Sequence, residues 1–462
     1  MTVRKVDYLI VGAGAMGMAF ADTLFSETGA TIAIVDRYGR PGGHWTLAYP
    51  YVRLHQPSSF YGVNSTALGS GEKDAMGGNR GLYELASAPE ICAYFERILQ
   101  RRLLPSRRVH YFPLCEHEGE GVIRSKVTGD LLDIEATTLV DATYMNVTVP
   151  AMRPPPFEVS DGIACLPLNA LGHLERAHEG YVVIGGGKSA MDAILWLLAH
   201  QVSHEAITWI MPRDSWLLDR ANIQFQGEFY ERNVLDRTGQ LEAIASSETI
   251  DDMFATLEAS GQLMRLDPSI RPTMYRCATV TRTELESLRT ITNVVRLGRV
   301  KHIDAREIVL DDGAIPTSTG ILHVDCTADG LPQRPAVPIF AGNRLTLQSV
   351  RTCQQVFSAA FIAHVEATGG DDARKNAVCG VVPHPDSDVD WLRVTLASMR
   401  NQFQWQEDAA LRAWLSNARL DGFARPAGEA NESTPGLEKA RERTRAAAPA
   451  AIRKLEALLA QA

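Results

Sequence analysis

Two glycine-rich segments of this chain have the residue types and the spacing that bind the pyrophosphate of a dinucleotide. The first is the run Gly12-Ala13-Gly14-Ala15-Met16-Gly17. Gly12 lets the chain turn tightly, Gly14 lets the backbone approach the phosphates, and Gly17 lets the following helix pack closely. Asp36 would accept hydrogen bonds from a ribose diol, and Arg37 beside it is assigned to the same site. The segment predicts a dinucleotide site, and the alternative is a glycine turn packed for structural reasons only.

The second segment is Gly185-Gly186-Gly187-Lys188-Ser189. It ends like a phosphate-binding P-loop, but Val182 stands where that loop needs its first glycine. The spacing fits a second dinucleotide turn, to which we assign Gly185, Gly187, Lys188 and Ser189. Arg213 follows the next strand pattern, where NAD-preferring folds carry a carboxylate. This cation favours NADP, and the alternative is a solvated loop arginine.

Each glycine turn needs a buried strand before it and a helix after it. Apolar strand patterns cover residues 6–11 and 31–35 around the first turn, and residues 181–184 and 207–211 around the second. We therefore predict an α/β fold with two dinucleotide-binding, Rossmann-like domains. Two such domains imply two nucleotides that exchange electrons, FAD at the first and NADPH at the second.

The order of these patterns predicts an FAD-binding domain interrupted by the NADPH-binding domain. We expect the FAD domain in residues 1–150 with a return segment in 331–385, and the NADPH domain in 151–330 with a helical insertion in 215–290. A helical C-terminal extension is expected in 386–462, broken by a Pro/Gly-rich linker between Asp421 and Gly436. We interpret its basic run from Leu437 to Ala462 as a solvated helix face or a homo-oligomer contact.

The composition excludes several classes of protein. A net charge of -9 lacks the basic footprint of a nucleic-acid binder. Because the first strand pattern begins near Val6, we expect no signal peptide, and we expect no membrane span because no apolar run reaches about 18 residues. We expect a cytoplasmic protein. The seven cysteines include no CxxC pair, so we expect reduced, mostly buried thiols, no metal site and no dithiol reductase chemistry.

At this point the sequence resembles the flavin-containing monooxygenase family, the class B FAD/NADPH monooxygenases that include Baeyer–Villiger and N-hydroxylating enzymes. The resemblance covers roughly residues 6–366. It rests on the two glycine turns, on Gly42-Gly43-His44-Trp45 and on Ala341-Gly342-Asn343. It implies that Gly43, His44 and Trp45 line the FAD, and that Asn343 takes the place of the aspartate that binds the FAD ribityl chain.

The run from His44 to Tyr61 interleaves aromatic residues with His, Arg and Gln and has neither helical nor strand periodicity. This suits a loop over the flavin ring and its substrate. In the family, a segment similar to residues 52–57 carries an active-site asparagine, and the alignment places His55 there. The resemblance makes His55 and Gln56 the catalytic candidates, and the alternative is a histidine satisfied in a packed loop.

The resemblance implies a monooxygenase that consumes NADPH and O2 and oxygenates a small organic substrate through a flavin C4a-hydroperoxide. Two alternatives remain open. One is a flavin oxidoreductase, an oxidase or dehydrogenase, that inserts no oxygen. The other is a non-catalytic scaffold, because the chain has Tyr144 and Asn343 at positions where the family has glycine and aspartate.

Overall fold

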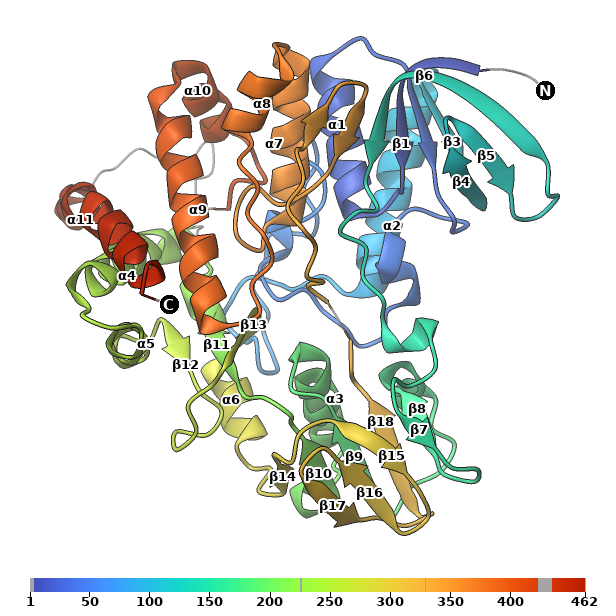
Figure 1. The fold of residues 1–462 in the computed structure, drawn as a ribbon, viewed down its shortest axis with the longest axis vertical. Coiled ribbons are helices and arrows are strands. Elements are labelled where there is room, and N and C mark those ends of the chain that lie inside the picture. The colour runs from blue at the N-terminus through green and yellow to red at the C-terminus, as the bar shows by residue number, and fades with distance from the viewer. Residues whose placement is uncertain (1–3, 225–226, 329, 423–433, 462) are drawn as a thin grey trace.

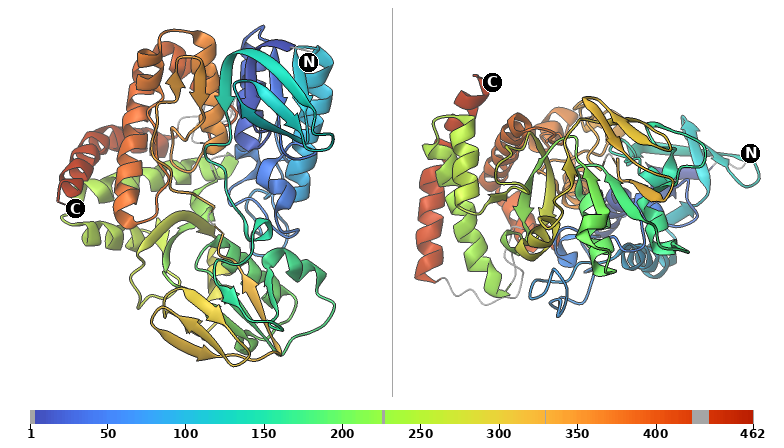
Figure 2. Two further views of the ribbon diagram at one scale, coloured as in Figure 1. Left: turned by 45° about the vertical axis from the view of Figure 1, so that its right-hand side comes forward. Right: turned by 90° about the horizontal axis from the view of Figure 1, so that it is seen from below.

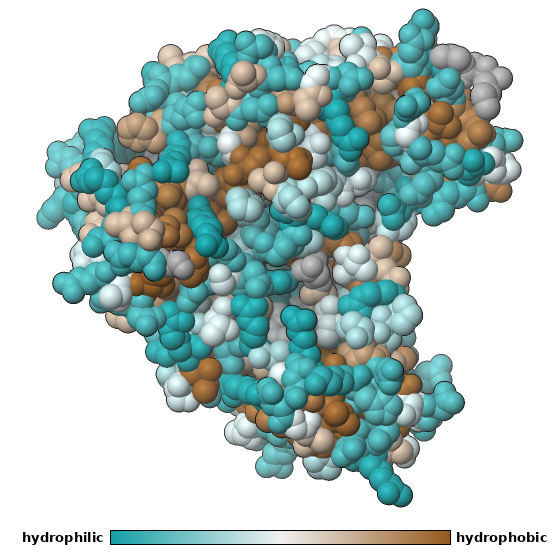
Figure 3. All heavy atoms as spheres, viewed as in Figure 1, coloured by the Kyte–Doolittle hydropathy of each residue, from teal (hydrophilic) through white to brown (hydrophobic). Residues whose placement is uncertain are grey.

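The computed structural model describes residues 4–224, 227–328, 330–422 and 434–461 of the 462-residue chain. A mostly parallel sheet forms its upper part and a parallel sheet its lower part, with a group of helices beside them (Figure 1). The predicted α/β class with two Rossmann-like sheets is confirmed. On the face drawn in Figure 3, hydrophilic residues dominate and apolar residues form separate groups.

The first sheet is built around the N-terminal strand and has the strand order β19-β20-β6-β1-β2-β3. Neighbours from β20 to β3 run parallel, whereas β19 and the β4–β5 hairpin are antiparallel additions. The strands are β1 (Arg4–Val11), β2 (Ile32–Val35), β3 (Val109–Phe112), β4 (Cys115–Gly119), β5 (Val122–Ser125), β6 (Leu131–Asp141), β19 (Phe340–Ala341) and β20 (Arg344–Thr346).

Helices α1 (Ala15–Glu27) and α7 (Gln355–Thr368) pack against each other beside this sheet, and α2 (Ala88–Ile98) joins the same core. Alanine and glycine let α1 approach closely: a Cβ on Gly17 would lie 1.9 Å from the carbonyl oxygen of Gly12. The helix therefore begins directly above the carboxyl end of β1, where its N-terminus faces any bound phosphate.

The second sheet is wholly parallel and lies, in sequence, between β6 and β20 of the first. Its spatial order is β14 (Val294–Val295), β10 (Ile207–Ile210), β9 (Gly180–Ile184), β18 (Ile321–Asp325) and β8 (Cys165–Pro167). All five residues of β9 are buried, as expected for a central strand. Helix α3 (Lys188–Ala199) follows β9, and a small sheet of β7 (Glu158–Val159), β15 (Val300–Ile303), β16 (Glu307–Leu310) and β17 (Gly313–Pro316) lies nearby.

The region predicted as a helical insertion contains α4 (Tyr230–Ser246), α5 (Ile250–Ala259) and α6 (Arg282–Leu288). It also contains a sheet that the sequence pattern missed, formed by β11 (Ser215–Asp219), β12 (Leu263–Met264) and β13 (Met274–Val280). These strands were hidden because β11 pairs with β13 across more than fifty intervening residues, which no local pattern reveals.

The C-terminal region is helical, with α8 (Asp372–Val378), α9 (Asp388–Glu407), α10 (Ala409–Asn417) and α11 (Pro435–Leu459). Most of the linker predicted between Asp421 and Gly436 lies outside the described residues. Helix α11 runs alongside α4 (Figure 2) and buries Ala451, Leu455 and Leu458 in a core shared with the insertion. The basic C-terminal helix is therefore not solvated all round: its apolar face is covered within the chain. None of the described helices is long and apolar enough to cross a membrane.

Candidate functional site

A cavity of about 650 Å³ lies where the two sheets and the insertion meet. Its wall includes Gly14 and Gly43 from the first sheet's side, and Gly187 from the second turn. Apolar and polar side chains of the insertion complete it, among them Leu241 and Arg237. Both predicted dinucleotide turns thus open on one space.

The first turn has the geometry that its glycines predict. Gly12 has a φ of +104°, which disfavours other residues, and Gly43 faces Gly14 so closely that a Cβ on Gly43 would lie 2.9 Å from the Gly14 Cα. This narrow cradle, free of side chains, fits the pyrophosphate of a dinucleotide.

Asp36 is 5% exposed and supports the turn. Its Oδ2 accepts a hydrogen bond from the Ala13 amide at 2.6 Å, and its Oδ1 accepts one from the Tyr38 amide at 2.7 Å. Burial raises the pKa of this carboxyl, and the two amides oppose the shift. Asp36 therefore orders the turn itself, in addition to any contact with a ribose. Arg37 lies 3.6 Å from Glu116 on the surface and does not line the cavity.

His44 and Trp45 lie in a short 3-10 helix, Gly43–Leu47, and both line the cavity. The Trp45 indole donates to the Tyr61 hydroxyl at 2.7 Å, which fixes the ring at the cavity wall. Burial lowers the pKa of His44 to about 4, so its imidazole is neutral at neutral pH.

His55 and Gln56 also line the cavity. Burial is the main cause that lowers the pKa of His55 to about 3, and the positive charges of Lys188 and Arg220 add to it. The Arg220 guanidinium is 1% exposed and donates to the His55 carbonyl at 3.1 Å and to Glu284 at 2.8 Å. Arg220 and Glu284 thus hold the His55 segment, a role that no sequence spacing indicated.

The second turn leads into α3, whose first residue is Lys188. Gly185 has a φ of +139°, and a Cβ there would lie 2.8 Å from the Cys326 carbonyl oxygen. Gly187, Lys188 and Ser189 line the cavity. Lys188 pairs with Asp192, which also accepts a hydrogen bond from the Tyr49 hydroxyl at 2.6 Å. The Tyr49–Asp192–Lys188 group joins the run from His44 to Tyr61, here called the aromatic loop, to the second turn. The sequence analysis did not predict this group.

Like Arg37, the assigned cofactor residues Arg213 and Asn343 lie away from the cavity wall. Arg213 stands close to the second turn, but its side chain binds Asp386 at 2.8 Å and also the Thr273 carbonyl. Asn343 is exposed at the start of β20, where its carbonyl accepts from the Leu139 amide. Since cofactors bind at the carboxyl ends of parallel strands, Asn343 lies at the wrong end of β20, and its assignment is corrected.

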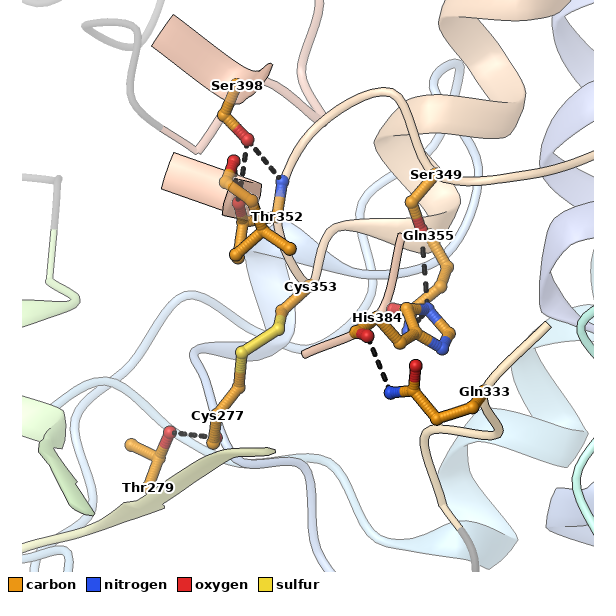
Figure 4. Close-up of a disulfide and its surroundings, with 10 residues drawn as sticks. Cys277, Thr279, Gln333, Ser349, Thr352, Cys353, Gln355, His384 and Ser398 are labelled. Carbon is orange, nitrogen blue, oxygen red and sulfur yellow. Dashed lines mark hydrogen bonds between the residues drawn. A yellow bond between two sulfur atoms is a disulfide. The ribbon is translucent and has the colours of Figure 1, made fainter. Parts of the chain in front are cut away.

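The expectation that every cysteine is a free thiol is also corrected. All seven cysteines lie in the described part of the chain, and Cys277 and Cys353 form a disulfide. Their separation of 76 residues left no local signal. Figure 4 shows this disulfide, and both of its cysteines line the cavity.

Comparison with known proteins places the chain among bacterial relatives. No family model matches it. The uncharacterized proteins Rv2000 and MT2056 of Mycobacterium tuberculosis and Mb2023 of Mycobacterium bovis are each 52% identical to it over 421 residues, which is 91% of this chain and 78% of theirs. This chain belongs to their family.

Solved structures show which known proteins share the fold of this chain. An open cyclohexanone monooxygenase is similar over 81% of this chain and 88% of its own, with 15% identity and a TM-score of 0.52. An oxidized steroid monooxygenase bound to NADP is similar over 97% and 99%, with 16% identity and a TM-score of 0.50. The resemblance to class B flavin monooxygenases is thus confirmed at the level of the fold.

Proposed function

We propose that this chain is an FAD-dependent, NADPH-consuming monooxygenase that inserts one oxygen atom of O2 into a small organic substrate. The observation that carries the proposal is the single cavity shared by both dinucleotide turns. Hydride transfer requires the two nucleotides to meet, and a cavity lined by Gly14, Gly43 and Gly187 allows that contact. The monooxygenases whose fold the chain shares support the same assignment.

The residues of this chain have separate tasks in the proposal. The Gly12–Gly17 turn and Gly43 bind the FAD pyrophosphate, and Asp36 holds that turn in shape. The second turn, with Lys188 and Ser189, binds NADPH, and Arg213 recognises its 2′-phosphate after leaving Asp386. The bound flavin supplies the two-electron chemistry that activates O2.

The aromatic loop then controls the oxygen chemistry. His55 is a neutral hydrogen-bond donor to the oxygen that is transferred, and Trp45 with Tyr61 keeps water from the reacting centre. Arg220 is a positioning residue that acts through the His55 backbone. The substrate enters from the side of the insertion, where Leu241, Ile244 and Met274 line the cavity.

The test is to purify the protein and follow NADPH, O2 and H2O2 together. A yellow protein that absorbs near about 450 nm holds flavin. We expect NADPH oxidation with O2 consumption, and less than one H2O2 per NADPH once a substrate is present. Release of one H2O2 for every NADPH with all substrates would indicate an oxidase. A colourless protein that neither binds nor oxidises NADPH would indicate a scaffold.

A further inference from the structure

The Cys277–Cys353 disulfide lies in the wall of the cavity. Cys326 also lines the cavity but is a buried free thiol, whereas Cys277 and Cys353 are half-buried and are joined to each other. The oxidised pair is therefore reachable from the space in which we place the cofactors. A disulfide that only stabilised the fold would need no such access.

The disulfide joins the cofactor side of the cavity to the substrate side. Cys353 lies between β20 and α7, at the carboxyl end of the first sheet, where the Gly12–Gly17 turn also lies. Cys277 belongs to β13 of the insertion. Because ligands of such folds bind at the carboxyl ends of the strands, Cys353 is on the flavin side of the cavity.

The backbone at both cysteines is held in an unusual conformation. Cys277 has a φ of 53° and Cys353 a φ of 55°, in the left-handed region that non-glycine residues seldom adopt. Such conformations persist where the surroundings impose them, and they concentrate at functional sites. On the Cys353 side, the Thr352 amide donates to the Ser398 hydroxyl at 3.0 Å (Figure 4), which ties the turn to α9.

The wall around the disulfide is polar enough to support a thiolate. Thr352, Gln355 and His384 also line the cavity, and Arg351, which is ion-paired with Asp421 at 2.7 Å, lies two residues before Cys353. Hydroxyl and amide groups can solvate the charged form of a thiol. Reduction would therefore not leave a thiolate in a purely apolar site.

We propose that Cys277–Cys353 is a second redox centre that takes two electrons from the reduced flavin. The inference rests on the proposed function, because NADPH must first reduce the flavin. With reduced flavin bound, the disulfide would accept a hydride equivalent and the flavin would be left oxidised. The S–S bond breaks, both electrons remain on sulfur, and the proton of the hydride equivalent gives a thiol beside a thiolate; one further proton from solvent gives two thiols.

Anaerobic titration of the holoenzyme with NADPH tests this directly. We expect uptake of about two equivalents of NADPH per flavin, since the flavin and the disulfide each accept an electron pair. Cys277→Ser and Cys353→Ser should each reduce the uptake to about one equivalent. Cys115→Ser, which replaces a half-buried free thiol outside the cavity wall, should leave it at about two.

A count of thiols gives a second readout that is independent of flavin absorbance and of the serine variants. The alkylated thiols of the denatured wild-type holoenzyme should rise from five to seven after anaerobic NADPH. The apoprotein treated in the same way should keep five.

The outcomes separate the two proposals. A flavin bleached by about one equivalent, with the disulfide intact, would leave the proposed function standing and overturn this inference. Seven thiols in the isolated oxidised holoenzyme would also overturn it. A protein without bound flavin would instead overturn the proposed function.

Discussion

The protonation state of His55 is the feature on which the proposed oxygen chemistry depends most. An imidazole with an ordinary pKa would protonate reduced oxygen at the flavin and release H2O2, whereas a neutral imidazole donates a hydrogen bond without losing its proton. Burial, with Lys188 and Arg220 adding to it and Glu284 opposing, lowers the pKa of His55 to about 3. We therefore expect His55→Gln, which keeps a donor, to preserve coupling better than His55→Ala.

The size of the effect follows from the pKa of about 3. At pH 6, a pKa of about 6.5 would leave about three quarters of the imidazole protonated, and a pKa of about 3 leaves about one part in a thousand. Between these two values the unfolded chain binds a proton that the folded chain does not. The contribution of neutral His55 to the free energy of unfolding is therefore fully present above about pH 6.5. It decreases as the pH falls, and by pH 5 about 2 kcal/mol of it is lost.

Two assays check this. Nuclear magnetic resonance of ¹³C-labelled histidine should show one signal, absent in His55→Gln, that does not titrate down to pH 5. Urea unfolding at pH 7.5 and pH 5 should show that the free energy of unfolding falls less at pH 5 in His55→Gln than in the wild type. His204→Gln, at an exposed position, is the control and should behave like the wild type. Two results would refute the reasoning. One is a His55 signal that titrates near pH 6.5. The other is H2O2 release by the wild-type protein that rises below pH 7 and that His55→Gln abolishes.

Three further predictions concern the two turns and the support of the His55 segment. Gly17→Ala places a methyl group 1.9 Å from the Gly12 carbonyl oxygen, so the amount of flavin retained after dialysis should fall at least about tenfold. The control variant Gly39→Ala, whose Cβ would lie 3.9 Å from the Leu114 side chain, should keep its flavin. Arg213→Ala should raise the KM for NADPH and leave the KM for NADH unchanged. Asp386→Asn, which releases the Arg213 guanidinium, should lower the KM for NADPH. Equal effects on both nucleotides would show that Arg213 does not belong to the NADPH site. Arg220→Met leaves the Glu284 carboxylate without its ion-pair partner and should lower the free energy of unfolding, measured in urea, by about 3–5 kcal/mol. The double variant Arg220→Met/Glu284→Leu should recover most of this loss. A double variant no more stable than the single one would contradict the prediction.

The parts of the fold that were predictable from sequence depend on local contacts. Gly12 and Gly185 require a positive φ, and Gly17 is pressed against the Gly12 carbonyl within one turn of helix. Because these constraints act between residues that are close in sequence, the spacing of the glycines was enough to predict the two turns. The same holds for His44 and Trp45, which follow Gly43 directly and reach the cavity wall with it.

The parts that were not predictable depend on pairs of residues far apart in sequence. Arg220 contacts the His55 carbonyl across 165 positions, and Arg213 meets Asp386 across 173. Asn343 was assigned from the short segment Ala341-Gly342-Asn343, yet the hairpin of β19 and β20 places it at the amino end of β20. Side-chain type alone did not show which end of a strand a residue occupies.

The second turn and the segment that carries His55 are electrostatically linked through Lys188. This residue contributes to the low pKa of His55 and also lines the part of the cavity assigned to NADPH. A bound phosphate near Lys188 would offset part of its charge and so weaken its effect on the imidazole. Burial is the larger cause of the shift, however, and a bound nucleotide excludes still more water. We therefore expect His55 to stay neutral with and without nucleotide, so its proposed role as a hydrogen-bond donor would not depend on the release of NADP.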